Sequence, residues 1–256
     1  MVERSRPAGM VRLVRDAALA LSGLAVFVIV WEIVAKVRDD PIVLVTPDRV
    51  LVTAIQQFHE RSYWDDWRVS LSEYAIGMAL AISTGVILGA ILGQIPHLKR
   101  AADPVLTAFY STPTVALAPI FILWFGLGQL SKVMVVFYVA VLPITVITAT
   151  GIANVDPTYL DVARVFRTSR VRRLFTVLLP AAMPSVIGAI RIGSGVGLIG
   201  VILGEFFGSQ AGLGYLVLFA TNRFDLALLL VGVISLASVG IVITALLSVV
   251  ERRWSG

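Results

Sequence analysis

Long apolar stretches alternate along this chain with shorter polar or basic segments. Each stretch is close to the ~20 apolar residues that an α-helix needs to cross the hydrocarbon core of a bilayer. The stretches cover residues 17–35, 70–93, 105–125, 133–153, 185–207 and 226–250. Continuous apolar runs favour helices over a β-barrel, because each helix satisfies its own backbone groups. The pattern predicts an all-α polytopic membrane protein with about six transmembrane helices.

Composition supports this prediction. Of the 256 residues, 58% are hydrophobic and 14% are charged, whereas a soluble domain is about half apolar and a quarter charged. We expect a single transmembrane domain over residues 1–256, with a basic N-terminal segment at 1–16 and a cytoplasmic loop at 154–184. The first apolar run is longer than the core of a signal peptide, and no clear A-x-A cleavage site follows it, so we expect an uncleaved span.

The basic residues set the expected orientation, because Lys and Arg concentrate in cytoplasmic loops. With a cytoplasmic N-terminus, the inner segments hold Arg4, Arg6, Arg12, Arg15, Lys99, Arg100, Arg164, Arg167, Arg170, Arg172, Arg173, Arg252 and Arg253. The outer segments hold Lys36, Arg38, Arg49, Arg61, Arg68, Lys132 and Arg223. The excess on the inner side predicts that both termini are cytoplasmic.

Several kinds of chemistry lack the residues that they need. The chain has no Cys, and its two His, His59 and His97, lie far apart, so we expect no metal site. A membrane-embedded hydrolase would need a nucleophile with a base, or metal ligands, at membrane depth. A proton-coupled secondary carrier would need acids in mid-span, whereas the acids here lie near span ends; it remains the alternative from another class. We expect no catalytic residue and no cofactor in this chain.

Residues 161–184 interrupt the apolar pattern with five arginines between the fourth and fifth spans. Asp156 and Pro157 predict a helix start, and Thr168 and Ser169 predict a break followed by a new N-cap. The apolar residues of the second piece recur at i, i+3, i+4 and i+7, at Val171, Leu174, Phe175 and Leu178. The segment is therefore predicted to form two short amphipathic helices at an angle on the cytoplasmic face.

Two prolines, Pro180 and Pro184, are expected to end the second helix before the fifth span. The residues alone leave three functions open for this segment. The helices could lie on anionic lipid, with the arginines reaching the headgroups. They could bind DNA as a helix-turn-helix, although a recognition helix tethered between two spans can hardly enter a major groove. They could also dock into a groove on a cytoplasmic partner.

A resemblance favours docking. The segment resembles the cytoplasmic "EAA" loop of bacterial ABC importer permeases, with the pattern Glu-Ala-Ala, three residues, Gly, nine residues, Ile-x-Leu-Pro. Asp-Val-Ala at 161–163 fills the first three positions, and the run from Val177 to Pro180 fills the last four at the same spacing. Arg167 occupies the glycine position, which is a departure from the pattern. In the family this loop forms the coupling helices that dock into the ATPase subunit.

Three further blocks carry the resemblance. Residues 45–55, 103–133 and 178–217, the last with a terminal Gly-Leu-Gly-Tyr, resemble permeases of sulfonate, taurine and nitrate importers. The resemblance implies a permease of the binding-protein-dependent (type I) family in the bacterial inner membrane. It would form the translocation path for a small anionic solute of the sulfonate, taurine or nitrate type. A heteroaromatic or vitamin-precursor solute is the alternative within the same family.

The resemblance also implies partners. No Walker A sequence occurs in the chain, so ATP, Mg and hydrolysis are expected on two separate ATP-binding subunits. A second permease copy, forming a homodimer, and an extracytoplasmic solute-binding protein would complete the assembly in the bilayer. Nucleic acid is not an expected partner.

The ATPase-coupling residues that the resemblance implies are Asp161, Val162, Ala163, Arg164, Phe166, Arg167, Ser169 and Pro180. A positive φ at Arg167 would cost about 1–2 kcal/mol for a residue other than glycine. We therefore expect the bend of the loop at Thr168 and Ser169 instead. Arg167→Gly should then keep assembly and transport.

Ionisable residues inside spans are candidates for function. Arg191 and Glu205 are the candidate residues of the translocation path. Arg191 could line an anion pathway, or it could pair with a carbonyl or carboxylate as a structural tie. The acids near span ends, Glu32, Glu73 and Glu205, are expected to reach the membrane interface.

Small residues recur about every four positions in two spans, at Gly77, Ala81, Gly85, Gly89 and Gly93, and at Gly193, Gly197, Gly200 and Gly204. Small residues allow helix backbones to approach closely in lipid. We expect these ridges to pack within one subunit, and a sliding or dimerising surface is the alternative.

Overall fold

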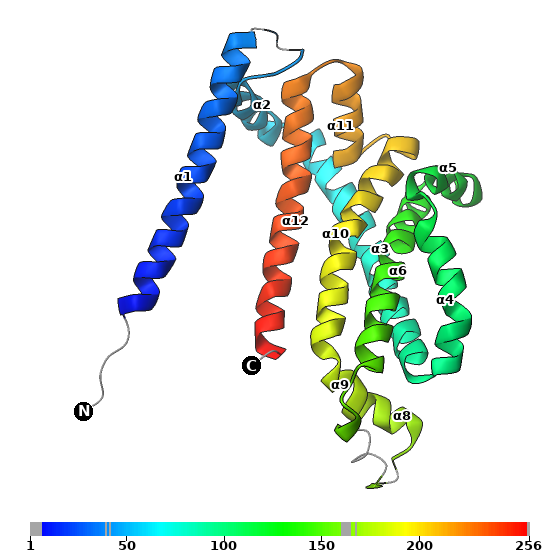
Figure 1. Ribbon diagram of the computed structural model, residues 1–256. Helices are drawn as coiled ribbons and strands as arrows, with labels where there is room; N and C mark the ends of the chain where they lie inside the picture. Colours follow the sequence, from blue (N-terminus) through cyan, green and yellow to red (C-terminus); the bar gives the residue numbers. More distant parts are fainter. Residues whose placement is uncertain (1–6, 39, 41, 160–164, 167, 255–256) are drawn as a thin grey trace.

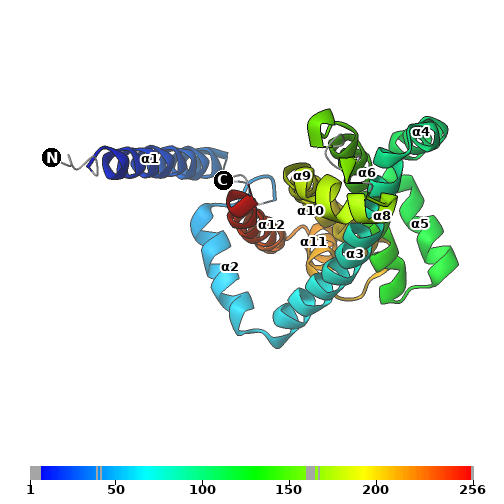
Figure 2. The same cartoon turned by 90° about the horizontal axis from the view of Figure 1, so that it is seen from below.

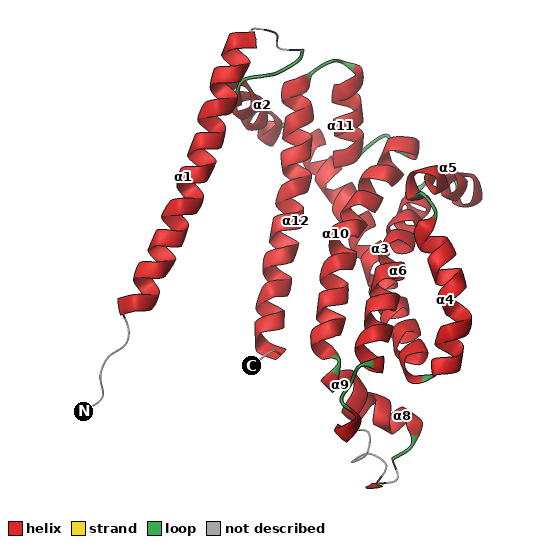
Figure 3. Ribbon diagram, in the orientation of Figure 1, coloured by secondary structure: helices red, strands yellow, loops and turns green. Residues whose placement is uncertain are grey.

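A computed structural model describes residues 7–38, 40, 42–159, 165–166 and 168–254, which fold into helices joined by short links, with no strand among them (Figure 1; Figure 3). The helices are α1 (Pro7–Arg38), α2 (Pro47–His59), α3 (Arg61–Gln94), α4 (Pro96–Ser111), α5 (Thr114–Phe125), α6 (Gln129–Ala153), α8 (Arg170–Arg173), a π-helical turn (Leu174–Leu178), α9 (Leu179–Ala181), α10 (Met183–Gly208), α11 (Leu213–Asn222) and α12 (Leu226–Trp254). The all-α prediction is confirmed.

Four helices in the described part of the chain are long and apolar enough to cross a membrane, namely α3, α6, α10 and α12. They contain the predicted second, fourth, fifth and sixth spans. The predicted first span lies inside α1, a continuous helix of 32 residues that stands apart from the bundle (Figure 1; Figure 2). Trp31 of α1 donates its indole N–H to the carbonyl of Val45 at 2.9 Å, which holds the C-terminal end of α1 near α2.

The predicted third span is not one helix. Its residues divide between α4 and α5, which meet at 94°. Thr112, at the break, has φ −77° and ψ 124°. This extended conformation is what the following Pro113 favours, because its ring disfavours a helical residue before it. The bent pair is a broken span or a re-entrant loop, and counting it as one span raises the total to five.

Helix α6 lies at the centre of the bundle, between α3 and α10 (Figure 1). The small-residue ridges of α3 and α10 face neighbouring helices within the chain. A Cβ added at Gly89 would lie 2.6 Å from Thr148 Cβ, and one at Gly200 would lie 2.6 Å from Val139 Cγ2. A Cβ added at Gly197 would lie 2.7 Å from the sulfur of Met78 on α3. Close packing within one subunit, as expected, therefore occupies these faces.

The predicted second amphipathic helix begins where expected. Ser169 precedes α8, and its hydroxyl accepts the backbone N–H of Arg172 at 3.3 Å. The helical run continues through Pro180, so the prediction that this proline ends the helix is wrong. The N–H of Leu179 bonds the carbonyl of Leu174, five residues back. This wider π turn relieves the clash between a proline ring and the preceding turn.

The run ends at Ala182, which has φ −87° and ψ 0°. Pro184 then occupies the first turn of α10, as the sequence predicts, where its missing N–H costs little. The described part of the loop thus passes into α10 through a single non-helical residue.

Candidate functional site

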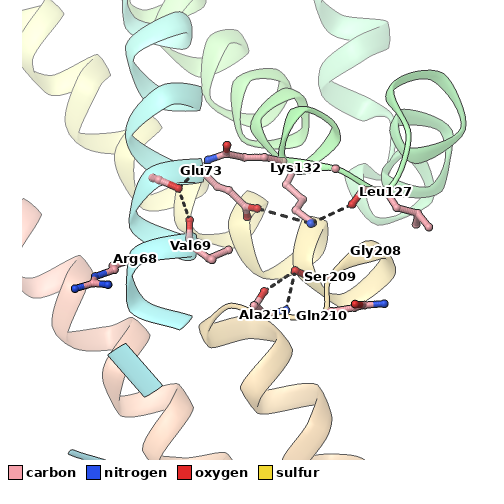
Figure 4. Close-up of a pocket in the computed structure, with 12 residues that line it drawn as sticks. Arg68, Val69, Glu73, Leu127, Lys132, Gly208, Ser209, Gln210 and Ala211 are labelled. Carbon is pink, nitrogen blue, oxygen red and sulfur yellow. Dashed lines mark hydrogen bonds and ion pairs between the residues drawn. The ribbon is translucent and has the colours of Figure 1, made fainter. Parts of the chain in front are cut away.

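A cavity of about 930 Å³ lies among α3, the start of α6 and the link between α10 and α11 (Figure 4). These segments are at the end of the bundle opposite α8 and α9 (Figure 1). Its lining consists of Arg68, Val69, Ser72, Glu73, Leu127, Gly128, Gln129, Lys132, Gly208, Ser209, Gln210 and Ala211. Glu73 and Lys132 meet in this cavity, whereas Arg68 pairs with Asp65 at 3.3 Å and its side chain points away from them (Figure 4).

Glu73 and Lys132 approach each other from α3 and α6 (Figure 4). Lys132 Nζ lies 3.8 Å from Glu73 Oε1, and the two side chains are 7% and 1% exposed. The expectation that Glu73 reaches the membrane interface is therefore wrong. Glu73 lies four residues before Gly77, so it shares the packed face of α3 with the small-residue ridge. That spacing was the signal in the sequence for its burial.

Glu205 is also fully buried, so it does not reach the interface either. Its carboxylate accepts the hydroxyl of Ser70 at 2.5 Å, the N–H of Gly214 at 2.5 Å and that of Tyr215 at 3.2 Å. These partners lie on α3 and at the start of α11. Glu205 therefore fastens α11 to the bundle and does not line the cavity described above.

The link before α11 requires a glycine. Gly212 has φ +120°, a conformation that L side chains rarely adopt. A Cβ at Gly212 would also lie 2.4 Å from the Glu205 carboxyl carbon. Asp66 accepts the N–H of Gly212 at 2.7 Å, so two carboxylates from different helices hold this link.

Arg191 pairs with Glu251 near the other end of the bundle, which joins α10 to α12. Arg191 lies about two turns after the start of α10, Glu205 lies within one turn of its end, and the partners found for one are not those of the other. The two candidate residues of the translocation path are thus not brought into one site. The pairing of Arg191 with a carboxylate favours the structural tie that the sequence left open.

Of the proposed ATPase-coupling residues, Phe166, Ser169 and Pro180 lie in the described part of the chain, and all three are exposed. Asp161, Val162, Ala163, Arg164 and Arg167 lie outside the described residues. Large apolar side chains nearby stand out from the bundle end, with exposed fractions of 80% for Val165, 75% for Phe166, 69% for Val171 and 61% for Phe175. An apolar tip flanked by arginines suits a protein-docking surface.

Lys132 is the functional candidate that sequence reasoning missed. It was counted as an outer basic residue, yet only 6% of it is exposed. The signal was its place at the start of an apolar run, four residues before Val136, which packs on the α3 ridge. Among the residues that the structure describes, no group of three or more His, Asp or Glu could hold a metal ion.

A family model described as the inner membrane component of binding-protein-dependent transport systems matches residues 81–256. The chain is 27% identical to the taurine transport system permease protein TauC of Escherichia coli, over 94% of this chain and 91% of that protein. It is 32% identical to the riboflavin transport system permease protein RibX of Chloroflexus aurantiacus, over 90% of this chain and 88% of that protein.

A solved structure shares the fold. A chain of the MetNI methionine ABC transporter, in an inward-facing conformation, aligns with a TM-score of 0.63 and 17% identity. The alignment covers 76% of this chain and 94% of that one.

Proposed function

Because the chain belongs to the family of inner membrane components of binding-protein-dependent transport systems, and is therefore the permease subunit of an ABC importer, we propose that it carries a small anionic solute. The relative TauC is a permease of a taurine transport system, and the sulfonate group of taurine is the anionic group that supports this class. The cavity supports it as well, because its lining includes the ammonium group of Lys132, and a cationic group attracts anions.

A heteroaromatic or vitamin-precursor solute is the second candidate. The observation that favours it is the similarity to the riboflavin permease RibX. The charged lining of the cavity argues against it, because an uncharged ring offers no opposite charge to Lys132 or to Glu73.

The exposed apolar tip around Phe166 is the proposed docking surface for the ATP-binding subunits. Its exposure is the main support for a role of this loop in coupling to the ATPase. Two such subunits would hold ATP and Mg and perform the hydrolysis. A second copy of the permease and an extracytoplasmic binding protein would complete the importer. With the tip in the cytoplasm, both termini are cytoplasmic and the cavity faces outward.

Movement at the tip would reach the spans through the chain itself. The helical run from Arg170 to Ala181 joins α10 through Ala182 alone, and α10 packs closely on α6. Closure of the ATPases would therefore move α10 against α6 and change access to the cavity. Binding of the solute shifts this equilibrium only by its differential affinity for the two states.

Reconstitution tests this function. The tagged full-length chain is expressed with its binding protein and ATPase, purified, and placed in liposomes. Co-purification of the ATPase and uptake that requires internal or external ATP, but persists with a protonophore, is the expected result. Uptake by the chain alone that collapses with the proton gradient would establish a secondary carrier instead.

A further inference from the structure

A second cavity, the α8 cavity, lies between the link from α3 to α4 and the segment formed by α8 and the π turn, and its volume is about 590 Å³. These segments lie together at the lower end of the bundle in Figure 1. Leu174 of the π turn packs against the buried cluster that contains Ala90 of α3, which fixes the two walls of the cavity to each other. The volume is within the range of known ligand sites, roughly 300–1,000 Å³.

The α8 cavity contains a positive charge that lacks a counter-charge. Arg173 lines it, and the described part of its lining includes no Asp or Glu. The side chain of Arg173 is partly buried, and its Nε is covered by protein without a hydrogen-bond partner among the residues that the structure describes. A guanidinium group keeps its charge in proteins and has five donors. Because a covered charge without a partner is unfavourable, an anion that reaches Arg173 would be stabilised there.

His97 adds a second donor to the α8 cavity. Arg100 donates from Nη2 to His97 Nδ1 at 2.8 Å, and a guanidinium group cannot accept a hydrogen bond. The imidazole proton is therefore assigned to Nε2, which is a donor. Gln94 uses its own Nε2 to donate to the carbonyl of Ala90 at 3.2 Å. Two donors, one of them charged, suit an oxyanion such as a phosphate group.

The remaining lining is apolar, which favours an amphiphile over a free anion. It consists of Ile91, Ile95, Pro96, Val171 and Leu174. Ile87 lies one turn before Ile91 on the same face of α3, and 58% of it is exposed. The apolar surface thus continues from the cavity along α3 into the predicted second span. An inorganic phosphate would leave this surface uncovered, whereas an acyl chain would cover it.

The α8 cavity lies at the depth of lipid headgroups. Helix α3 ends at Gln94, directly after its apolar run at 70–93. In the orientation proposed above, this end of the bundle is cytoplasmic. Basic pockets between transmembrane helices on that side bind the headgroups of anionic lipids. A zwitterionic headgroup would bring an ammonium group close to Arg173, so the net charge of the headgroup should decide binding.

We propose that the α8 cavity binds one anionic phospholipid. Its phosphate lies against the guanidinium group of Arg173 and Nε2 of His97, and one acyl chain follows the apolar face of α3 past Ile91. The lipid bridges the end of α3 and the segment that leads into α10. This site is separate from the cavity around Lys132, and it does not depend on the identity of the solute.

Native mass spectrometry of the purified, delipidated full-length chain tests the proposal. The probes are dioleoyl phosphatidylglycerol, dioleoyl phosphatidylcholine, and glycerol phosphate, which has the phosphate group without acyl chains. The first molecule of phosphatidylglycerol should bind about tenfold more tightly than phosphatidylcholine, because only its headgroup carries a net negative charge. Glycerol phosphate should not displace it. Equal affinities for the two lipids, or displacement by glycerol phosphate, would overturn the proposal.

Variants of two neighbouring arginines locate the site. Arg173→Gln should abolish the preference for phosphatidylglycerol, and Arg173→Lys should keep part of it, because the charge remains without the planar fork. Arg172→Gln is the matched control, since Arg172 is exposed and does not line the cavity. It should bind the anionic lipid like the wild type. An equal loss in Arg172→Gln would show that the basic loop attracts lipid without a defined site.

A variant of the apolar wall tests the contact with the acyl chain. Ile91→Ser should weaken both lipids severalfold and leave the preference for phosphatidylglycerol unchanged, because only burial of the chain is reduced. Thermal unfolding of each variant in detergent shows whether it is folded. Wild-type lipid affinity in both Arg173→Gln and Ile91→Ser would refute the site. The assay contains no ATPase, so its failure would leave the coupling role of the tip around Phe166 unaffected.

Discussion

The carboxylate of Glu205 on α10 accepts the backbone N–H of Gly214 on α11 at 2.5 Å. Ser70 links the same carboxylate to α3 and accepts the N–H of Leu213 at 2.7 Å. The first N–H groups of a helix lack partners within it, and a negative charge near them is favourable. One buried acid and one hydroxyl thus hold the start of a short apolar helix against two spans.

Glu205→Gln should loosen this helix. The amide has no charge and presents donors toward the N–H groups of α11, so we expect a loss of roughly 1.5–3 kcal/mol in stability. Hydrogen exchange at Leu213, Gly214 and Tyr215 should accelerate, and the melting temperature in detergent should fall. Glu32→Gln, at an exposed pair on α1, is the control. Unchanged exchange in Glu205→Gln would show that the carboxylate does not hold α11.

Alanine substitutions at a packed glycine of α3 and at an unpacked glycine of α10 should change the stability of the chain in opposite directions. Gly89→Ala would place a Cβ 2.6 Å from Thr148 Cβ, so it should destabilise the chain by about 1–3 kcal/mol. Gly188→Ala has open space on α10 and should stabilise it by up to about 1 kcal/mol, because alanine is the better helix former. Thermal unfolding of the two variants measures both effects, and equal shifts would contradict the close approach of α3 and α6.

Variants of Arg191 and Glu251 distinguish a structural ion pair between α10 and α12 from a role of Arg191 in the translocation path. Arg191→Gln and Glu251→Gln should each lower stability, and the double variant should lose less than the sum, with a coupling energy of about 0.5–3 kcal/mol. The exchanged pair Arg191→Glu with Glu251→Arg should recover stability and transport together. Transport that stays lost while stability returns would indicate that Arg191 contacts the solute.

The sequence predicted the spans that are continuous because an apolar run and its polar ends are local features. Span five was expected at 185–207, and α10 covers Met183–Gly208. The pattern predicted one continuous span at 105–125, so the break at Thr112 was missed. Proline removes one donor wherever it lies, but the packing of α5 decides whether the chain bends by a few degrees or by 94°.

The roles of the acids were less accessible from the sequence. Glu73 and Glu205 lie near span ends, which suggested an exposed position. Depth along a helix does not reveal which neighbour covers a residue, and both acids point to other helices of the bundle. Lys132 was overlooked for the same reason, because its partner Glu73 lies on a helix distant in sequence.

Two exposed phenylalanines allow a direct test of the coupling role of the loop. Phe166 and Phe224 are 75% and 74% exposed, and Phe224 lies at the opposite end of the molecule, between α11 and α12 (Figure 1). Phe166→Asp and Phe224→Asp therefore make the same chemical change at two surfaces. The measurement is the amount of ATPase subunit that co-purifies with each tagged permease.

We predict that Phe166→Asp reduces the bound ATPase about tenfold or more, because a charge buried without a partner in an interface costs roughly 2–5 kcal/mol. Phe224→Asp should retain the ATPase at the wild-type level. Wild-type recovery of the ATPase with Phe166→Asp would contradict the account, and it would leave the basic loop without a part in coupling.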